Sequence, residues 1–177
     1  MKRDRIATGV TGVDKVFGGF PRGATTIFSG WPGVGKSTLL AQSAVAFAKQ
    51  RLHVAWASGE CQHDEVVAQM ARVGVTENDS KYLHIFGGID VGDVEVLTRY
   101  AEKVKAVLLV VDSLQTVLVP GNTAQIRGAA STLSRFAQKT GTIVLAIAHL
   151  TKSGELQCPS IAFRFDAVAY LERWWGM

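Results

Sequence analysis

Cysteine is scarce in this sequence. Of its 177 residues only Cys61 and Cys158 are cysteines, and they show neither the paired spacing of a zinc site nor that of a disulfide framework. Two isolated thiols are typical of a reducing compartment, so we expect a cytoplasmic protein. The N-terminus is basic at Lys2, Arg3 and Arg5, but no apolar segment follows it, so we expect no secretion signal.

Long hydrophobic runs are absent as well. The run that begins at Ala106 ends after six residues at Asp112, whereas a membrane span needs about 20 apolar residues. Apolar residues make up 47% of the chain and charged residues 19%, a balance that is typical of a globular protein and excludes a disordered one. Because no linker, repeat or low-complexity tract stands out, we expect a single domain over residues 1–177 and no contact with a membrane.

A strong excess of one charge is also lacking. The chain has 19 Lys and Arg against 15 Asp and Glu, a net charge of +4. This excess permits binding to a polyanion but does not require it, because a solvated basic N-terminus explains part of the excess.

What the sequence does contain is an alternation of short apolar runs with longer helical stretches. The expected strands are Thr25–Ser29, Val54–Ala57, Tyr82–Phe86, Val107–Val111, Ile143–Ala148 and Ala167–Leu171. The expected helices are Lys36–Gln50, Asp64–Val73, Val91–Lys105 and Thr123–Lys139. Continuously apolar strands are buried on both faces, so the pattern predicts an α/β fold whose mostly parallel sheet carries helices on both sides. Ligands of such sheets bind beyond the carboxyl ends of the strands.

The most specific pattern is Gly30-Trp31-Pro32-Gly33-Val34-Gly35-Lys36-Ser37, which matches the P-loop pattern G-x-x-x-x-G-K-[ST] between a strand and a helix. Its glycines let successive backbone N–H groups point at a phosphate, and the N-terminus of the next helix adds positive potential. We expect Lys36 to reach the β- and γ-phosphates, Ser37 to ligate Mg²⁺ and Thr38 to bind the α-phosphate. The alternative is a glycine-rich turn that only links strand to helix.

Two acidic residues follow expected strands. Asp112 ends an apolar strand, where P-loop NTPases hold Mg²⁺ opposite the loop hydroxyl; a cap of the next element is the alternative. Ser113 either orients Asp112 or starts a turn. Glu60 follows the strand Val54–Ala57 and can orient or deprotonate an attacking water, so we predict that it is the catalytic base. Its alternative is a glutamate that is favourable near the N-terminus of the next helix.

His149 ends the strand Ile143–Ala148. A polar residue at that position can sense the γ-phosphate and pass the signal to the following loop, whereas a hydrogen-bonded structural histidine is the alternative. The predicted catalytic group is therefore Lys36, Glu60 and His149.

Beyond these motifs, the chain resembles the bacterial DNA-repair ATPase family RadA (also called Sms), within the RecA and KaiC superfamily. The segments that carry the resemblance are Thr8–Gly23, Ser58–Glu60, Val111–Val117, Pro120–Arg127, His149–Gly154 and Asp166–Glu172. The resemblance implies a RecA-like P-loop NTPase that hydrolyses ATP with Mg²⁺ and forms a homo-oligomer such as a hexameric ring. It further implies action on single-stranded DNA in recombination, repair, branch migration or helicase loading, with a recombinase or helicase as partner.

The resemblance also implies where DNA binds, because in the RecA class the segments after the Asp112 and His149 strands face the central channel. Here these segments are Val119–Arg127 and Leu150–Arg164. The expected contacts with DNA phosphates are Arg127, Lys152 and Arg164. A solvated charge is the alternative for Lys152.

Two aromatic residues lie in the second of these segments. Phe163 and Phe165 can stack on bases, but the alternating Phe-Arg-Phe pattern fits packing on an edge strand equally well.

Three features of RadA are not found in this sequence: the four-cysteine zinc module, the large protease-like C-terminal domain, and the Lys-Asn-Arg-Phe-Gly motif after the last strand, where Glu172-Arg173-Trp174-Trp175-Gly176-Met177 stands instead. That motif adds positive charge to a neighbour's nucleotide. We therefore expect slow turnover by the chain alone, or hydrolysis only when another protein completes the site. A compact phage or plasmid protein fits these departures.

Three functions stay open at this point. The first is a DNA-dependent ATPase, a RadA-like motor or helicase loader. The second is a nucleotide-gated regulator or adaptor in the manner of KaiC, and the third is a replicative ring helicase of the phage or plasmid type.

Overall fold

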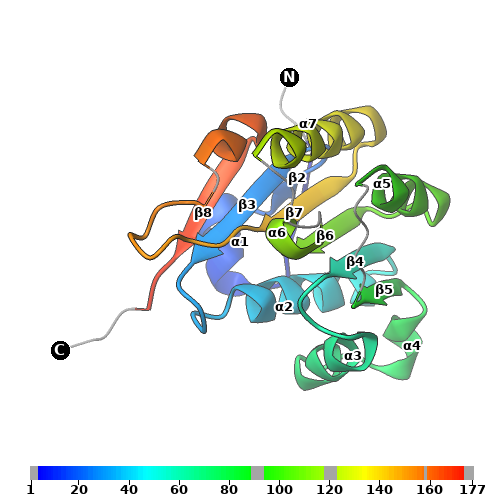
Figure 1. Cartoon of the computed structure of the whole chain (residues 1–177). Helices are drawn as coiled ribbons and strands as arrows, with labels where there is room; N and C mark the ends of the chain where they lie inside the picture. Colours follow the sequence, from blue (N-terminus) through cyan, green and yellow to red (C-terminus); the bar gives the residue numbers. More distant parts are fainter. Residues whose placement is uncertain (1–3, 89–93, 118–122, 158, 174–177) are drawn as a thin grey trace.

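The computed structural model describes residues 4–88, 94–117, 123–157 and 159–173, and a six-stranded sheet lies at its centre (Figure 1). In chain order the strands are β3 (Thr25–Gly30), β4 (Val54–Ser58), β5 (Leu83–Gly87), β6 (Leu108–Asp112), β7 (Ile143–Ile147) and β8 (Ala167–Leu171). Across the sheet their order is β5-β4-β6-β7-β3-β8, and every neighbouring pair is parallel. The carboxyl ends of all these strands therefore meet at one edge.

Helices cover both faces of the sheet (Figure 1). On one face lie α1 (Thr11–Phe17), α2 (Lys36–Lys49) and α3 (His63–Arg72). On the other face lie α5 (Val94–Lys103), α6 (Leu114–Val117), α7 (Thr123–Thr140) and the 3₁₀ helix η1 (Pro159–Arg164). This arrangement confirms the predicted RecA-like α/β fold, with a parallel sheet and helices on both sides.

Alternating residues of the strands build two separate cores. On β6, Leu108 and Val110 pack with α2 and α3, whereas Leu109 and Val111 pack with α5 and α7. All of these side chains are buried. Because both faces of the strand are covered, neither can carry polar residues, which explains the uninterrupted apolar run in the sequence. Polar residues appear only where the strand ends.

Some elements were not expected from the sequence. The segment before β3 forms α1 between two short antiparallel strands, β1 (Arg5–Ile6) and β2 (Phe20–Pro21). A short helix, α4 (Glu77–Ser80), precedes β5. These elements are too short for hydrophobic periodicity to reveal them. The helix expected over Val91–Lys105 is α5, whose described part begins at Val94; residues 91–93 lie outside the described residues.

The prediction for Phe163 and Phe165 needs correction. The segment forms η1 rather than an edge strand, because β8 begins only at Ala167. Phe165 is buried in the core with Ile161, so it does not offer its ring for stacking on a base. Phe163 is 89% exposed and remains available.

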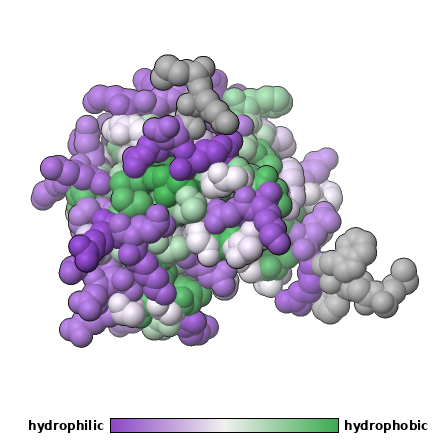
Figure 2. All heavy atoms as spheres, turned by 180° about the vertical axis from the view of Figure 1, so that it is seen from behind, coloured by the Kyte–Doolittle hydropathy of each residue, from purple (hydrophilic) through white to green (hydrophobic). Residues whose placement is uncertain are grey.

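The surface of the molecule is mainly polar. Seen from behind, hydrophilic side chains surround smaller hydrophobic patches (Figure 2). Among the helices that the structure describes, none is long and apolar enough to cross a bilayer.

Candidate functional site

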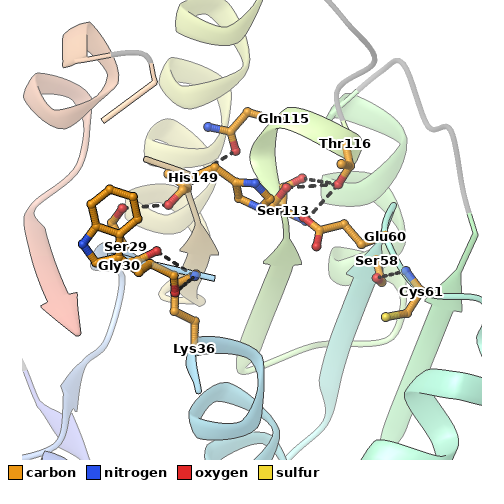
Figure 3. Close-up of polar contacts among 12 residues, drawn as sticks. Ser29, Gly30, Lys36, Ser58, Glu60, Cys61, Ser113, Gln115, Thr116 and His149 are labelled. Atoms are coloured by element: carbon orange, nitrogen blue, oxygen red, sulfur yellow. Dashed lines mark hydrogen bonds and ion pairs between the residues drawn. The ribbon is translucent and has the colours of Figure 1, made fainter. Parts of the chain in front are cut away.

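The sequence-predicted site residues converge at the carboxyl edge of the sheet. β3 leads into the phosphate loop, β4 is followed by Glu60, β6 ends in Asp112, and β7 is followed by His149. The register places Ser58 opposite Asp112. A cleft of about 340 Å³ opens between these strand ends and is lined by Lys36, Ser37, Thr38, Glu60, Asp112, His149 and the loop glycines. Figure 3 shows Lys36, Glu60 and His149 at this edge.

The phosphate loop needs glycine at particular positions. Gly35 has a φ of 102°, a left-handed conformation that L-residues rarely adopt, directly before α2 begins at Lys36. A methyl group on Gly30 would lie 2.4 Å from the carbonyl oxygen of Leu171, so β8 blocks any side chain there. The loop is thus fixed both by backbone conformation and by close packing against β8.

Lys36 lies over its own loop. Its Nζ donates hydrogen bonds to the carbonyl oxygens of Gly30 (2.8 Å) and Trp31 (3.1 Å). Partial burial lowers the pKa of Lys36, while the nearby carboxylates of Glu60 and Asp112 act in the opposite direction. The ammonium is therefore held by weak carbonyl partners that phosphate oxygens can replace with stronger, charge-assisted hydrogen bonds.

Asp112 is a buried acid that faces the first residue pair of α2. Its side chain is almost fully enclosed, and desolvation raises the pKa of Asp112 to about 6, although a hydrogen bond from Ser37 opposes the shift. A carboxylate whose burial disfavours its charge gains from a cation. The described ranges contain no cluster of three His, Cys, Asp or Glu side chains that could hold a metal. Ser37 and Asp112 fit Mg²⁺, because this ion takes few protein ligands and keeps water and phosphate oxygens around it.

Glu60 and His149 form a close pair. Nε2 of His149 lies 2.7 Å from Oε1 of Glu60, although Glu60 follows β4, His149 follows β7, and β6 lies between these two strands in the sheet. The hydrogen bond from His149 lowers the pKa of Glu60, and the same bond raises the pKa of His149. Both side chains remain partly exposed to the cleft. The pair therefore holds an ionised carboxylate next to the phosphate loop.

The neighbours of this pair fix its position. The backbone N–H of His149 donates to Oε1 of Gln115 at 3.4 Å (Figure 3). A hydrogen bond from the side chain of Ser113 also lowers the pKa of Glu60. Ser113 also starts the turn into α6, since its carbonyl accepts the N–H of Thr116 at 3.2 Å. Of the two alternatives for Ser113, the structure supports the turn, and the hydroxyl lies against Glu60 rather than orienting Asp112.

Gln115 was missed by the sequence reasoning. Its amide nitrogen is buried and has no hydrogen-bond partner among the described residues, while its oxygen contacts the backbone before the loop that follows β7. No spacing rule links positions 115 and 149. Only the pairing of β6 with β7 brings their following segments together.

The backbone on both sides of Glu60 is held by hydrogen bonds. α3 begins at His63, and its start is fixed by a reciprocal cap in which Oε2 of Glu65 accepts the N–H of Gln62 at 2.8 Å. On the other side, the N–H of Gly59 donates to the carbonyl of Asp112 at 3.0 Å. Glu60 therefore sits in a short connection that is anchored at both ends.

The residues expected to meet DNA do not line this cleft. Arg127 lies on α7, Lys152 lies in the loop after β7, and Arg164 ends η1; all three are exposed. Residues 119–122 of the first expected DNA segment lie outside the described residues. Cys61 is a free thiol, as the sequence predicted, and burial raises the pKa of Cys61; Cys158 lies outside the described residues.

Comparisons with known proteins agree with this architecture. The family model of an AAA domain matches residues 3–155. The chain is 30% identical over 178 residues to "DNA repair protein RadA" of Brucella abortus (strain 2308), covering 95% of this chain and 38% of that protein. To the RadA of Escherichia coli (strain K12) it is 31% identical over 164 residues, which is 89% of this chain and 34% of that protein. The chain thus spans well under half the length of these curated relatives.

A solved structure shows the same fold. The KaiC-like protein of the hyperthermophilic archaeon Pyrococcus horikoshii OT3 superposes with a TM-score of 0.76 at 21% identity, over 95% of this chain and 80% of that one. With its phosphate loop, its parallel sheet and these matches, the chain belongs to the AAA domain family and forms a RecA-like ATPase core similar to that of RadA.

Proposed function

We propose that the chain binds and hydrolyses ATP with Mg²⁺ and acts with that energy on single-stranded DNA, as a RadA-like motor or helicase loader in recombination, repair or branch migration. One observation carries the ATPase part of the proposal. Lys36, Ser37, Asp112, Glu60 and His149 come from four strand ends and line one cleft. This is the set of groups that phosphoryl transfer to water requires.

Binding begins at the phosphate loop. The backbone N–H groups of residues 33–38 and the N-terminus of α2 receive the phosphates, and Lys36 exchanges its carbonyl partners for phosphate oxygens. Ser37 and Asp112 would hold Mg²⁺, which would neutralise negative charge on the phosphates. Asp112, whose pKa is about 6 because the group is buried, would be held in its ionised form by such a cation.

Glu60 then handles the attacking water. Its carboxylate is ionised, because its hydrogen bond with His149 lowers its pKa, and it can therefore orient the water and accept its proton. Oε1 of Glu60 is bound by His149, so the strength of that contact sets how freely the base can turn toward the water. His149 in turn can exchange Glu60 for a γ-phosphate oxygen, which would link hydrolysis to the loop after β7.

The DNA part of the proposal rests on the relatives and on exposed cations. RadA proteins match the chain over most of its length. Arg127, Lys152 and Arg164 are exposed on the segments that follow β6 and β7. Phosphate contacts from such side chains give salt-dependent binding. We further propose a homo-oligomer in the cytoplasm, such as a ring, in which a neighbouring chain or another protein supplies the missing positive charge at the nucleotide.

The test is the ATPase rate with and without single-stranded DNA, run beside a measurement of assembly size. Stimulation by DNA in the wild type, and no hydrolysis in Lys36→Ala, would support the DNA-dependent motor. Hydrolysis that is indifferent to DNA would favour a nucleotide-gated regulator of a protein partner. Strand displacement from a forked duplex would favour a replicative helicase over a loader.

A further inference from the structure

The segment after β7 folds back on itself as a small hairpin, His149–Gln157. Its base is closed by the N–H of Gln157, which donates to the carbonyl of His149 at 3.0 Å. Its tip is closed by the N–H of Thr151, which donates to the carbonyl of Glu155 at 2.7 Å. Because backbone hydrogen bonds close the hairpin at both ends, we expect a displacement of its tip to displace its base as well.

The base of the hairpin contacts the hydrolytic site. His149, its first residue, holds Oε1 of Glu60 at 2.7 Å. Any shift of the hairpin therefore changes the partner of the proposed base.

The tip of the hairpin contacts the phosphate loop. A methyl group on Gly154 would lie 3.6 Å from Cζ2 of Trp31, so the indole ring lies directly beside the tip of the hairpin. Gly154 has a φ of 84°, the left-handed conformation that lets the tip turn here without a side chain in the way. Trp31 is 52% exposed and also borders an open hollow with Arg173, so among the residues that the structure describes it does not belong to the hydrophobic core.

Trp31 also contacts the group that binds phosphate. Its carbonyl oxygen accepts a hydrogen bond from Nζ of Lys36 at 3.1 Å. When Lys36 turns to a phosphate, the carbonyl of Trp31 loses this partner and the peptide is free to adjust. We therefore expect the backbone of Trp31 to move when nucleotide binds to Lys36, while its ring lies beside the hairpin.

We propose that Trp31 is a positioning residue that couples nucleotide binding to Glu60 through the His149–Gln157 hairpin. The inference rests on the proposed ATPase function. A large, stiff ring suits this role, because it covers a wide contact area with few rotatable bonds. Lys152 lies on the same hairpin, so the ring also sets the position of a cation that we assign to DNA.

The test compares Trp31→Ala and Trp31→Phe with the wild type, using Val96→Ala as the control. Val96 is also an exposed apolar side chain, 46% exposed, but it lies on α5. We expect Trp31→Ala to lower kcat by about 5- to 10-fold, and to weaken binding of a non-hydrolysable ATP analogue far less than Lys36→Ala does. Trp31→Phe should restore most of kcat, because an aromatic ring again reaches Gly154.

A second readout follows the ring directly. The chain has four tryptophans, so the signal of Trp31 is the fluorescence difference between the wild type and Trp31→Phe. We expect that difference to change when the ATP analogue and Mg²⁺ are added. A wild type that hydrolyses ATP, beside a Trp31→Ala variant with unchanged kcat and a Trp31 signal indifferent to the analogue, would overturn this inference alone. A wild type that neither binds nor hydrolyses ATP would overturn the proposed function as well.

Discussion

The two edges of the sheet each contain an acidic residue bound to a partner far away in sequence, but the two pairs are built differently. At the amino edge, one carboxylate oxygen of Asp166 accepts both the N–H (2.9 Å) and the hydroxyl (3.0 Å) of Thr25, and the N–H of Asp166 donates back to the carbonyl of Thr25 at 3.0 Å. At the carboxyl edge, Glu60 and His149 touch only through side chains, both partly exposed. The Asp166–Thr25 pair joins the backbones of the two segments, whereas the side chains of Glu60 and His149 can exchange each other for other partners.

This difference suggests that contacts at the amino ends of the strands stabilise the fold, while contacts at the carboxyl ends serve binding and turnover. Contacts that include backbone groups at the start of β3 and β8 fix which strands are neighbours. At the carboxyl edge the contacts of Lys36, Glu60 and Asp112 are made by side-chain atoms, so these residues can take new partners if a ligand binds. We therefore expect substitutions at the carboxyl edge to change binding and turnover, and substitutions at the amino edge to change the free energy of unfolding.

The largest effect should come from Lys36→Ala. Removing the ammonium takes away the only charge of the phosphate loop, and we expect the affinity for ATP to fall by about 100-fold or more. Isothermal titration calorimetry with ATP and Mg²⁺ measures it. Lys139→Ala, at an exposed lysine 3.9 Å from Glu102 near the opposite edge, is the matched control and should bind ATP as the wild type does. Equal affinities in both variants would contradict the division between the edges.

Glu60→Gln should come next. The amide keeps the size of the side chain but cannot accept the proton of water, so we expect kcat to fall by about 10²- to 10³-fold with little loss of nucleotide affinity. Single-turnover hydrolysis beside nucleotide binding separates the two quantities. Glu102→Gln, an exposed glutamate on α5, serves as control. Hydrolysis by Glu60→Gln at the wild-type rate would show that another group is the base.

Asp166→Ala should affect the other edge. Without the carboxylate, the buried N–H and hydroxyl of Thr25 lose their acceptor, and we expect the free energy of unfolding to fall by about 1–2 kcal/mol. Urea denaturation measures this quantity. The nucleotide affinity of the folded variant should stay that of the wild type. An unchanged free energy of unfolding together with weaker ATP binding would show that Asp166 serves nucleotide binding and not stability.

Lys152→Ala should have a smaller effect that is confined to DNA. We expect several-fold weaker binding to single-stranded DNA and a salt dependence of log K that is flatter by about one unit of slope. Fluorescence anisotropy at several salt concentrations measures both. Lys105→Ala, an exposed lysine between α5 and β6, is the control. Identical binding curves for the two variants would show that Lys152 is a solvated charge that does not contact DNA.

The smallest effect concerns pH and His84 on β5. Burial and the neighbouring His53 lower the pKa of His84 below its usual 6.5, so between these two values the unfolded chain binds a proton that the folded chain does not. The contribution of this residue to stability is therefore complete above pH 6.5 and is lost as the pH falls. Urea midpoints at about pH 7.5 and pH 5.5 should differ less in His84→Gln than in the wild type. Equal pH dependence in both would contradict the shift.

The sequence predicts the site better than it predicts the contacts within it. Glycine spacing identifies the phosphate loop, and a polar residue at the end of an apolar run identifies Asp112, Glu60 and His149, since parallel strands place such residues at one edge. The sequence does not predict that His149 binds Glu60 or that Gln115 supports it. These contacts depend on β6 lying between β4 and β7, and strand order is not encoded in any local pattern.

The errors have the same origin. Phe163 and Phe165 alternate with Arg164 in the manner of a strand, yet η1 forms because Ile161 and Phe165 together fill the core above the sheet. The Asp166–Thr25 pair spans 141 positions and could not be anticipated either. Tertiary packing decides both cases.

Gly59 lies where the cleft tolerates no larger residue. A methyl group at position 59 would lie 2.6 Å from the backbone carbon of Thr116, and the N–H of Gly59 is already taken by Asp112. The corner between β6 and α6 therefore leaves space for a hydrogen atom only. A shift of this corner would therefore move Glu60 and Asp112 together, because Gly59 directly precedes Glu60 and its N–H is bound to the carbonyl of Asp112.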